Sequence, residues 1–320
     1  MLLQQLSGSV PCSGEKLGHD LGITRAAVWK MVQELRRQGF VIRSHPGQGY
    51  CLQSPMQWLQ PLTISAALWQ AGVRVQVQRQ TTSTNQEVLQ AFSRQEGHAL
   101  AVLAEQQTAG RGRRGRTWLS PLAQNFYGSL GWRFDRAASA LAGLSLSIGV
   151  GVAEALEPLL GRKLGLKWPN DIILEQGKLG GILIELAGDA SGPCDVVIGL
   201  GLNHLGFASG TTPDQPCRQL HDYLQIERTE LAVLLLRALV DTVRVFEGEG
   251  LPAFADGFIQ RDVLLHQPVC VQRQGQGDLY GWGSGIAADG SMLLERQGQT
   301  VLINSGEVSV RVAAATGLGK

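Results

Sequence analysis

The sequence has few of the features that mark secreted, metal-binding or membrane-spanning proteins. It has five cysteines in 320 residues, and no two stand at the short spacing of a zinc site. An odd number of scattered cysteines argues against a disulfide framework and suits a reducing compartment. The first residues have neither a basic start nor a long apolar run, so no secretory signal is expected. We therefore expect a cytoplasmic protein.

An excess of one charge and an uninterrupted apolar run are also missing. The formal net charge is +1, so any binding to nucleic acid must come from a local patch. The most apolar long stretch, residues 138–160, contains serines, glycines and two glutamates. This pattern favours a buried helix over a membrane span, and no association with a membrane is expected.

The sequence does contain a cluster of arginines and glycines. Residues 110–116 are Gly-Arg-Gly-Arg-Arg-Gly-Arg and follow an apolar run at 99–104 that predicts a buried strand. Four guanidinium groups on a glycine-rich backbone repel one another, and each suits phosphate oxygens. The alternative is a flexible RNA-binding segment, but such segments are repetitive and this one occurs once. We interpret residues 110–116 as a loop that closes over phosphate.

Residues 1–54 predict a small DNA-binding domain. Ser13 can cap a helix that ends at Leu21, and Thr24 can cap a second helix through Gln38. Residues 40–52 predict a hairpin, which completes a winged helix-turn-helix. The alternative is a winged helix used only for protein contact. We favour DNA binding, because the outer side of the second helix carries basic residues and we expect no acidic residue there. That side comprises Arg25, Ala26, Trp29, Lys30 and Gln33.

The remaining chain predicts two further domains and an α+β fold class. Residues 53–61 contain two prolines and are typical of a linker. Residues 62–266 alternate strand-like and helix-like segments, which predicts a mixed sheet flanked by helices. Residues 267–320 have short strands separated by turns and predict a small β-barrel. Strands are predicted at 73–78, 98–105, 125–133, 164–168, 172–175, 178–186 and 195–202, and helices at 85–95, 139–160 and 229–247.

Several separate motifs, in one order, resemble those of the biotin protein ligases. The first is the segment around the arginine cluster, at 104–116. The others are Ser-Thr-Asn at 83–85, Lys-Trp-Pro-Asn-Asp at 167–171, Lys-Leu-Gly-Gly-Ile-Leu-Ile-Glu at 178–185 and Ile-Gly-Leu-Gly-Leu-Asn at 198–203. With the N-terminal domain, the chain is most similar to the bifunctional ligases that also repress the biotin operon. Each motif alone is weak, but their common order is specific.

The resemblance implies a fold and an activity. The central domain would have the core shared by biotin and lipoate ligases, and the C-terminal domain would be an SH3-like barrel. The enzyme would activate biotin with ATP and Mg²⁺ to biotinyl-5′-AMP and transfer biotin to a lysine of the biotin carboxyl carrier protein of acetyl-CoA carboxylase. Bound to biotinyl-5′-AMP, two copies would pair, through the strand at 178–186 near a sheet edge, and repress transcription at operator DNA.

The resemblance also assigns roles to residues. Lys178, Arg113 and Asp171 would be catalytic, with Mg²⁺ near Asp171. Gly14, Glu15, Lys16 and Thr24 would join the DNA-binding residues, although the segment before Gly14 is short enough to shorten the first helix. The residues expected to bind biotin or ATP are Ser83, Thr84, Asn85, Gln107, Gly110, Arg111, Gly112, Arg113, Trp118, Lys167, Asn170, Lys178 and Asn203.

Each of these motifs also has an ordinary structural interpretation. Lys178 could be a solvated charge at the start of a strand. The Pro-Asn-Asp sequence at 169–171 favours a simple turn, and Ser83 could merely cap the following helix. Two other functions stay open. One is a DNA-binding sensor that binds biotin without catalysis, and the other is a related ligase for lipoate or another acid.

Overall fold

The computed structural model describes most of the chain, as two compact units. The described residues are 2–6, 10–37, 40–52, 56–187, 192–206, 215–273, 277–306 and 308–313. The predicted helix end at Gln38 and the first linker residues, 53–55, lie outside them. One unit comprises Met1–Trp58 with Gly206–Asp214, and the other comprises Leu59–Leu205 with Gln215–Lys320.

The first unit contains the predicted helix-turn-helix with its hairpin. Its elements are α1 (Leu2–Leu6), α2 (Gly14–Leu21), α3 (Arg25–Arg37), β1 (Ile42–His45) and β2 (Gly49–Leu52). The Ser13 hydroxyl accepts the Lys16 N–H at 3.1 Å, and Gly22 closes α2 in the left-handed region at φ 67°. Leu17 of α2 and Val28 and Val32 of α3 are fully buried in the interior of this unit. The expected helix caps therefore form. The first helix is short, as expected, because α1 has only five residues.

The outer side of α3 is mostly as the sequence predicts. Trp29 is 53% exposed, and Arg25 and Lys30 are exposed as well. An acid is also present there, because Glu34 is exposed and pairs with Arg37 at 3.1 Å. Gln33 is half-buried and Gly14 is buried, so these two expose less surface than the other predicted DNA-binding residues.

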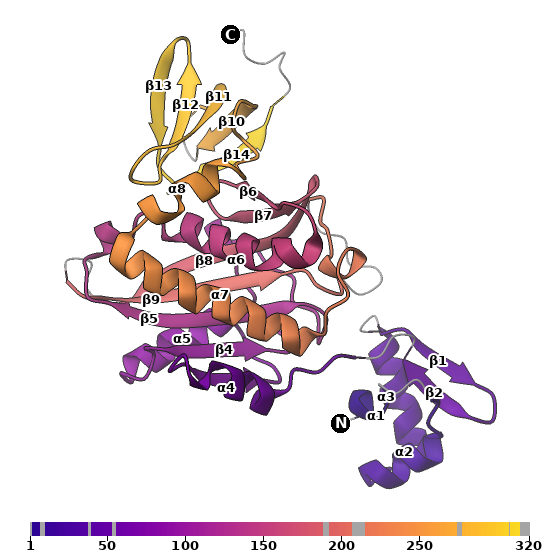
Figure 1. Ribbon diagram of the computed structural model, residues 1–320. Helices are drawn as coiled ribbons and strands as arrows, with labels where there is room; N and C mark the ends of the chain where they lie inside the picture. Colours follow the sequence, from indigo (N-terminus) through magenta and orange to yellow (C-terminus); the bar gives the residue numbers. More distant parts are fainter. Residues whose placement is uncertain are drawn as a thin grey trace. The chain divides into compact units, whose positions relative to one another are not determined.

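A seven-stranded mixed sheet forms the centre of the second unit (Figure 1). The strand order is β3-β4-β5-β9-β8-β7-β6, and only β3 and β4 are parallel. These strands lie close to their predicted positions, because their apolar patterns in the sequence are strong. Their bounds are β3 Arg74–Gln78, β4 Leu100–Ala104, β5 Phe126–Phe134, β6 Gly165–Lys167, β7 Asp171–Leu174, β8 Gly177–Ala187 and β9 Cys194–Leu202.

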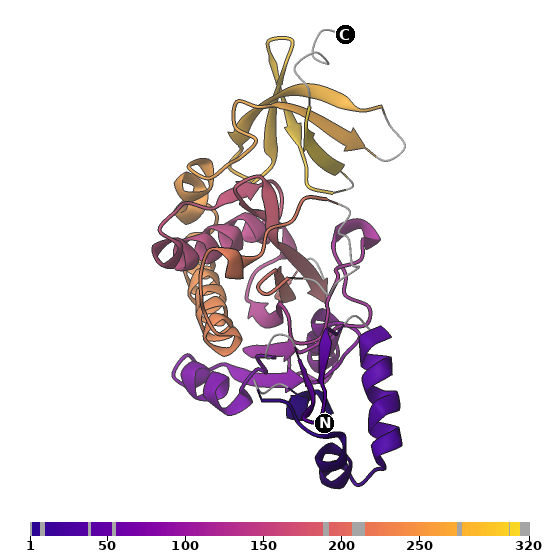
Figure 2. The same ribbon diagram turned by 90° about the vertical axis from the view of Figure 1, so that its right-hand side faces the viewer.

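Helices cover both faces of this sheet unequally. Helix α5 (Thr84–Ser93) packs on one face, where Val88 and Phe92 meet Val102 and Val197. Alternate strand residues point to the other face, into a larger core with α4 (Pro61–Trp69), α6 (Leu144–Leu160) and α7 (Arg228–Glu249). Figure 2 shows α7, in orange, to one side of the strands. The face shared with α5 is therefore the less covered one.

Two helices differ from the sequence prediction for local reasons. The helix predicted at 139–160 is divided, because Gly143 adopts φ 83° between a 3₁₀ turn at Ala138–Leu141 and α6. This apolar stretch is long enough to span a membrane, but 61% of an 18-residue apolar window within it is buried, as in a core helix. Helix α8 (Pro252–Ile259) was not predicted.

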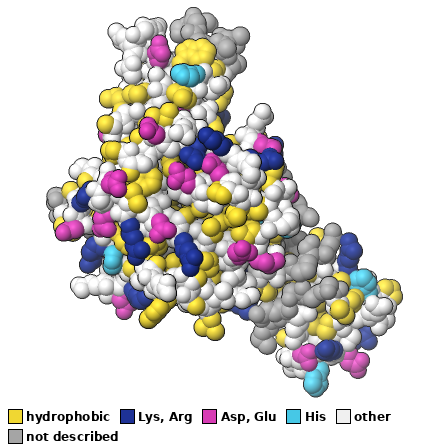
Figure 3. Space-filling model, in the orientation of Figure 1, with side chains coloured by type: hydrophobic (Ala, Val, Ile, Leu, Met, Phe, Trp, Pro, Cys, Tyr) yellow, Lys and Arg dark blue, Asp and Glu magenta, His cyan; other side chains and the backbone are white. Residues whose placement is uncertain are grey.

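Helix α4 was also not predicted, because its apolar residues point in two directions. Pro61, which the linker prediction included, begins α4 as its first helical residue. Ile64 and Leu68 are buried, whereas Leu62 and Trp69 are 87% and 80% exposed. Figure 3 shows hydrophobic side chains on the surface of the unit near the position of α4 in Figure 1. The sequence therefore has no amphipathic period at α4.

Strand β8 is not the edge strand of the sheet, but half of it has one unpaired side. Strand β9 pairs with β8 from Gly180 to Ala187, and β7 pairs with it only from Gly177 to Gly181. Beyond Ile182, no described strand pairs with the β7 side of β8. The prediction of a strand near a sheet edge therefore applies to the second half of β8.

The C-terminal strands form one five-stranded antiparallel sheet (Figure 1). The buried Val269 and Leu294 belong to the same core as α6 and α7. The Trp168 indole N–H also donates to the Gly290 carbonyl at 2.9 Å. The bounds are β10 Pro268–Arg273, β11 Leu279–Ile286, β12 Met292–Arg296, β13 Gln299–Ile303 and β14 Val308–Val312.

A buried ion pair fixes the point where the chain enters the second unit. Arg228, at the start of α7, donates to Glu105 at 2.7 Å and to the Asn125 carbonyl at 3.0 Å. The other Glu105 oxygen accepts the Leu59 N–H at 2.8 Å. Glu105 and Arg228 are 3% and 2% exposed, so their charges are satisfied by protein groups rather than water.

Candidate active site

The candidate site lies on the sheet face shared with α5. Cross-strand partners point to the same face, and Ser129, Gly199 and Leu183 form one such row across β5, β9 and β8. The next row contains Gly201 and Gly181. Three glycines in two neighbouring strands leave a shallow floor on which other side chains can lie.

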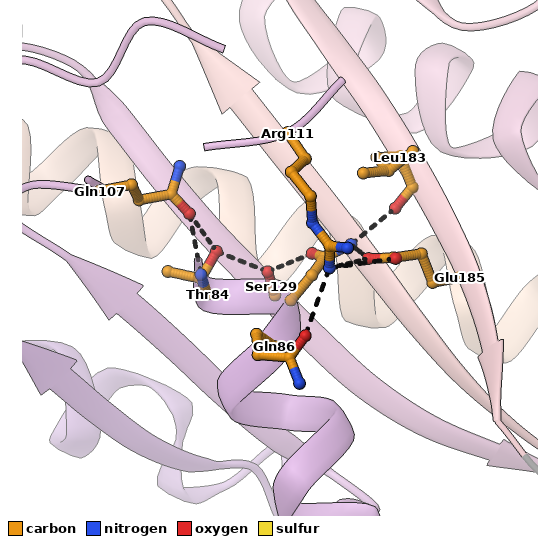
Figure 4. A network of polar contacts seen from close by, with 8 residues as sticks. Thr84, Gln86, Gln107, Arg111, Ser129, Leu183 and Glu185 are labelled. Atoms are coloured by element: carbon orange, nitrogen blue, oxygen red, sulfur yellow. Dashed lines mark hydrogen bonds and ion pairs between the residues drawn. The ribbon is translucent and has the colours of Figure 1, made fainter. Parts of the chain in front are cut away.

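Hydrogen bonds link the start of α5 to this floor (Figure 4). Ser129 is fully buried, and its hydroxyl lies 2.7 Å from the Thr84 hydroxyl and 2.6 Å from Asn85 Oδ1. Gln107 Oε1 accepts the Thr84 N–H at 2.8 Å, and Gln107 Nε2 donates to Ser120 at 3.0 Å. This end of the site is a neutral network of hydroxyl and amide groups.

A charged pair closes the network at its rim. Glu185 accepts from Asn85 Nδ2 at 2.6 Å and pairs with Arg111 at 3.2 Å. Arg111 also reaches Gln86 at 3.5 Å, so the loop at 110–116 begins against α5 and β8 (Figure 4). Asn85 Nδ2 further lies 3.4 Å from the Leu183 carbonyl.

The glycines are needed because side chains lie directly on the backbone. A Cβ at Gly199 would collide with the Asn85 carboxamide, and a Cβ at Gly201 would collide with the Trp118 ring. A Cβ at Gly110 would come within 2.5 Å of the Trp118 carbonyl. Trp118 is thus seated over β9, below the Lys178 ammonium at 5.4 Å from its ring centroid.

The other end of the site is cationic. Lys178 donates to Asp171 at 2.6 Å, and their side chains are only 16% and 18% exposed. Burial lowers the pKa of Lys167, Asp171 opposes this shift, and Lys178 adds to it. Burial also lowers the pKa of Arg113, again against the effect of Asp171. Several cations therefore surround one carboxylate, and Lys178 is not the solvated charge that the sequence left open.

Two asparagines hold the backbone around this cationic end. Asn170 Nδ2 donates to the Ile182 carbonyl at 2.7 Å, and Asn203 Nδ2 donates to the Lys178 carbonyl at 3.2 Å. Asn203 is 1% exposed, and its Oδ1 has no hydrogen-bond partner among the described residues. A buried acceptor without a partner is costly, which indicates a place for a bound molecule.

The loop at 110–116 contacts the C-terminal sheet as well as the pocket rim. Arg113 donates to the carbonyls of Ser305 and Gly306, and Arg116 lies 3.4 Å from the Ser309 hydroxyl. These partners are neutral, and the loop forms an ion pair with an acid at Arg111, which pairs with Glu185.

Most of the predicted binding residues therefore lie on one face of the sheet. The structure agrees with one of the ordinary interpretations of their motifs and not with another. Ser83 occupies the N-cap position of α5 but its side chain makes no capping bond. Residues 168–170 do form a turn between β6 and β7, which also carries Asn170 into the site. Gln86, Ser120, Ser129 and Glu185 were not predicted as site residues. Only Glu185 lay in a quoted motif, and contacts with the other three depend on strand and loop pairing.

Among the described residues, no group of three or more His, Cys, Asp and Glu side chains is placed to bind a metal. Asp171 provides one carboxylate at the cationic end. Mg²⁺ commonly binds through one or two carboxylates, substrate phosphates and water. The residues present therefore fit a magnesium ion only together with a polyphosphate.

Comparison with known proteins gives consistent matches. Residues 77–203 match the model of the Biotin/lipoate A/B protein ligase family, and residues 1–51 match that of an HTH domain. The chain is 38% identical to the bifunctional ligase/repressor BirA of Escherichia coli K12, over 94% of this chain and 93% of the relative. It is 32% identical to the biotin–[acetyl-CoA-carboxylase] ligase of Mycobacterium tuberculosis, over 73% of this chain and 88% of that protein.

Among solved structures, the fold is similar to the biotin protein ligase of Aquifex aeolicus in complex with biotin and ATP. The TM-score is 0.63 at 25% identity, over 75% of this chain and 99% of that chain. The similarity therefore extends over the whole Aquifex chain.

Proposed function

The chain belongs to the biotin/lipoate A/B protein ligase family, among its bifunctional ligase/repressors, and on this premise we propose the following reaction. The protein activates biotin with ATP to biotinyl-5′-AMP and transfers biotin to a lysine of a carrier protein. It is also a DNA-binding repressor. The observation that supports this best is the pairing of a neutral polar pocket with a cationic end on one sheet face.

The cationic end suits the activation step. A biotin carboxylate must approach the α-phosphate of ATP although both are negative. Fixed cations remove this repulsion and stabilise charge on the transferring phosphorus. Lys178, Lys167 and Arg113 are placed for this, and Lys178 exchanges its partner Asp171 for the reacting anion. Mg²⁺ bound to ATP near Asp171 would neutralise further phosphate charge.

The polar end suits the ureido ring of biotin. Hydroxyl and amide groups can match a ring that both donates and accepts. Trp118 then covers the chain of the bound acid, and the loop at 110–116 closes over the adenylate. The pocket residues in this proposal are Ser83, Thr84, Asn85, Gln107, Gly110, Arg111 and Gly112, with Asn170 and Asn203 facing the nucleotide.

Transfer needs a neutral amine on the carrier lysine, so a nearby base assists the second step. We assign this role to Asp171, which is released from Lys178 when the adenylate forms. A carrier domain of acetyl-CoA carboxylase is the proposed acceptor, as the names of relatives indicate for those proteins. The free cysteines suit a cytoplasmic location.

We divide the protein into a DNA-binding domain at 1–54, a ligase domain at 62–266 and an SH3-like domain at 267–320. The exposed Arg25 and Lys30 suit phosphate and base contacts. Glu15, Lys16, Thr24, Ala26 and Trp29 are also exposed. Replacing Arg25 or Lys30 by alanine should weaken operator binding and flatten its salt dependence, with ligase activity unchanged.

Ligand control of the DNA domain requires pairing of two copies. The unpaired side of β8 beyond Ile182 can add a strand from a second copy through backbone hydrogen bonds. Two linked DNA-binding domains then reach two half-sites. Biotinyl-5′-AMP should raise operator affinity by at least about tenfold, or about 1.4 kcal/mol. Titration of operator DNA with and without the adenylate measures this, and equal affinities would exclude control by the ligand.

One experiment separates the proposed ligase from its alternatives. The protein is incubated with ATP and either biotin or lipoate, and the products are identified by mass spectrometry. Biotinyl-5′-AMP alone supports the proposal, and a lipoyl product supports the related ligase. Binding of biotin with no adenylate from either acid indicates a sensor without catalysis.

A further inference from the structure

Glu185 fixes the orientation of a neighbouring amide in the pocket. One of its oxygens lies 2.6 Å from the side-chain amide of Asn85. The other pairs with Arg111 at 3.2 Å (Figure 4). An ionised carboxylate only accepts hydrogen bonds, so the Asn85 atom that faces it is the nitrogen, Nδ2. Glu185 therefore determines which way round the Asn85 carboxamide lies.

This orientation leaves Asn85 with acceptor capacity alone. Its Nδ2 has two hydrogens, one directed to Glu185 and the other to the Leu183 carbonyl at 3.4 Å. Its Oδ1 accepts the Ser129 hydroxyl at 2.6 Å and retains one lone pair. A molecule bound at Asn85 must therefore offer a donor there.

The orientation of Asn85 also determines which neighbouring atoms donate hydrogen bonds and which accept them. Ser129 has one proton, and Asn85 Oδ1 takes it, so the single Thr84 hydroxyl proton goes either to Ser129 at 2.7 Å or to Gln107 Oε1 at 3.1 Å. The Thr84 oxygen keeps acceptor capacity. Gln107 Nε2 donates to Ser120 and has a second hydrogen. The pocket thus presents acceptors at Asn85 and Thr84 and a donor at Gln107.

We infer that Glu185 is a positioning residue that sets this donor and acceptor pattern and thereby selects the ring that the pocket accepts. A cyclic urea, with two N–H donors and one carbonyl, complements it. The inference rests on the proposed function, because it concerns how that reaction chooses biotin. A neutral glutamine at this position could face Asn85 with either its nitrogen or its oxygen. Asn85 could then turn over, and the pattern would no longer be unique.

The test compares the full-length protein with its Glu185→Gln variant in acid-dependent pyrophosphate exchange. The substrates are biotin and the two cyclic carbamate analogues, in which one ring N–H is replaced by oxygen. In the variant, KM for biotin should rise about tenfold or more, as for loss of a hydrogen bond to a charged group, with a smaller change in kcat. The preference in kcat/KM for biotin over at least one carbamate should fall by about tenfold.

Two controls isolate the effect. Glu96→Gln makes the same change at an exposed glutamate paired with Arg94 at 3.4 Å, and it should leave the preference unchanged. Glu185→Gln is then repeated in an Arg111→Ala chain. The shift in preference should persist there, because it acts through Asn85. If it disappears, Glu185 acts through Arg111 and the inference is wrong.

The outcomes also separate this inference from the proposed function. Wild-type protein without biotin-dependent exchange would overturn the proposed function. Wild-type exchange together with an unchanged preference in Glu185→Gln would overturn the inference alone. Since glutamine has the shape of glutamate and the Glu185 side chain is 25% exposed, the variant should fold, which thermal unfolding verifies.

Discussion

The two ends of the site differ in how far the protein satisfies its own polar groups. At the pocket end, Thr84, Asn85, Gln107 and Ser129 bond to one another, and the charged pair of Arg111 and Glu185 lies at the rim. At the cationic end, several cations lie near the carboxylate of Asp171. The pocket end is thus already formed without ligand. The cationic end carries repulsion between its cations, so under the proposed function the pocket end would select the acid and the cationic end would favour its reaction with ATP.

The largest expected effect comes from breaking the cationic end. Lys178→Ala should reduce adenylate formation by about a hundredfold or more, as for loss of a cation aimed at a reacting anion. The fold should survive, because Lys167 and Arg113 remain near Asp171. Biotin-dependent pyrophosphate exchange measures the loss. Lys163→Ala, at an exposed lysine, is the matched control, and equal rates in both variants would remove Lys178 from the mechanism.

The next effect comes from breaking the pocket end alone. Gly199→Ala places a methyl group against the Asn85 carboxamide, which must move away from Ser129 and Glu185. Overpacking of this kind costs about 1–3 kcal/mol, so KM for biotin should rise about tenfold with little change in KM for ATP. Gly248→Ala, where a Cβ meets nothing within 4 Å, is the control. Parallel changes in both KM values would show that the two ends are not separable.

A smaller effect should appear in the loop that lies between the two ends. Trypsin should cut the free protein between Arg111 and Arg116, since the loop is held by exposed contacts. Biotinyl-5′-AMP should slow this cleavage severalfold, because its phosphate brings a further anion to the arginines of the loop. Peptide mapping over time gives the rates. Cleavage at the same rate with and without the adenylate would contradict closure of the loop.

The smallest effect concerns stability without ligand. Burial lowers the folded-state pKa of Lys167 below its usual 10.5, so its charge opposes folding at neutral pH. Lys167→Met should therefore unfold at a slightly higher temperature than wild type at pH 7, although it binds the adenylate more weakly. This difference should shrink as the pH rises towards 10.5, because Lys167 in the folded protein loses its proton below that pH. A variant less stable than wild type at pH 7 would show that the cationic end is not strained.

Sequence patterns predict the parts of this structure that depend on neighbours along the chain. The buried strands follow from apolar runs, and Ser13 caps α2 as its residue type indicates. The division before α6 depends on φ at Gly143, and α4 has no amphipathic period, so neither was predicted. The site shows the same limit. Lys178 and Asp171 belong to motifs, whereas the contacts of Ser129 and Glu185 with Asn85 join residues 44 and 100 positions apart.

The buried ion pair of Glu105 and Arg228 has a mechanical consequence. It holds the backbone of Leu59, the first residue of the second unit, and Glu105 is two residues before Gln107 of the pocket. Removing one partner of such a pair costs about 3–5 kcal/mol, so the anchor resists thermal forces. Residue 59, where the second unit begins, is thereby anchored to a residue that lies two positions from the pocket.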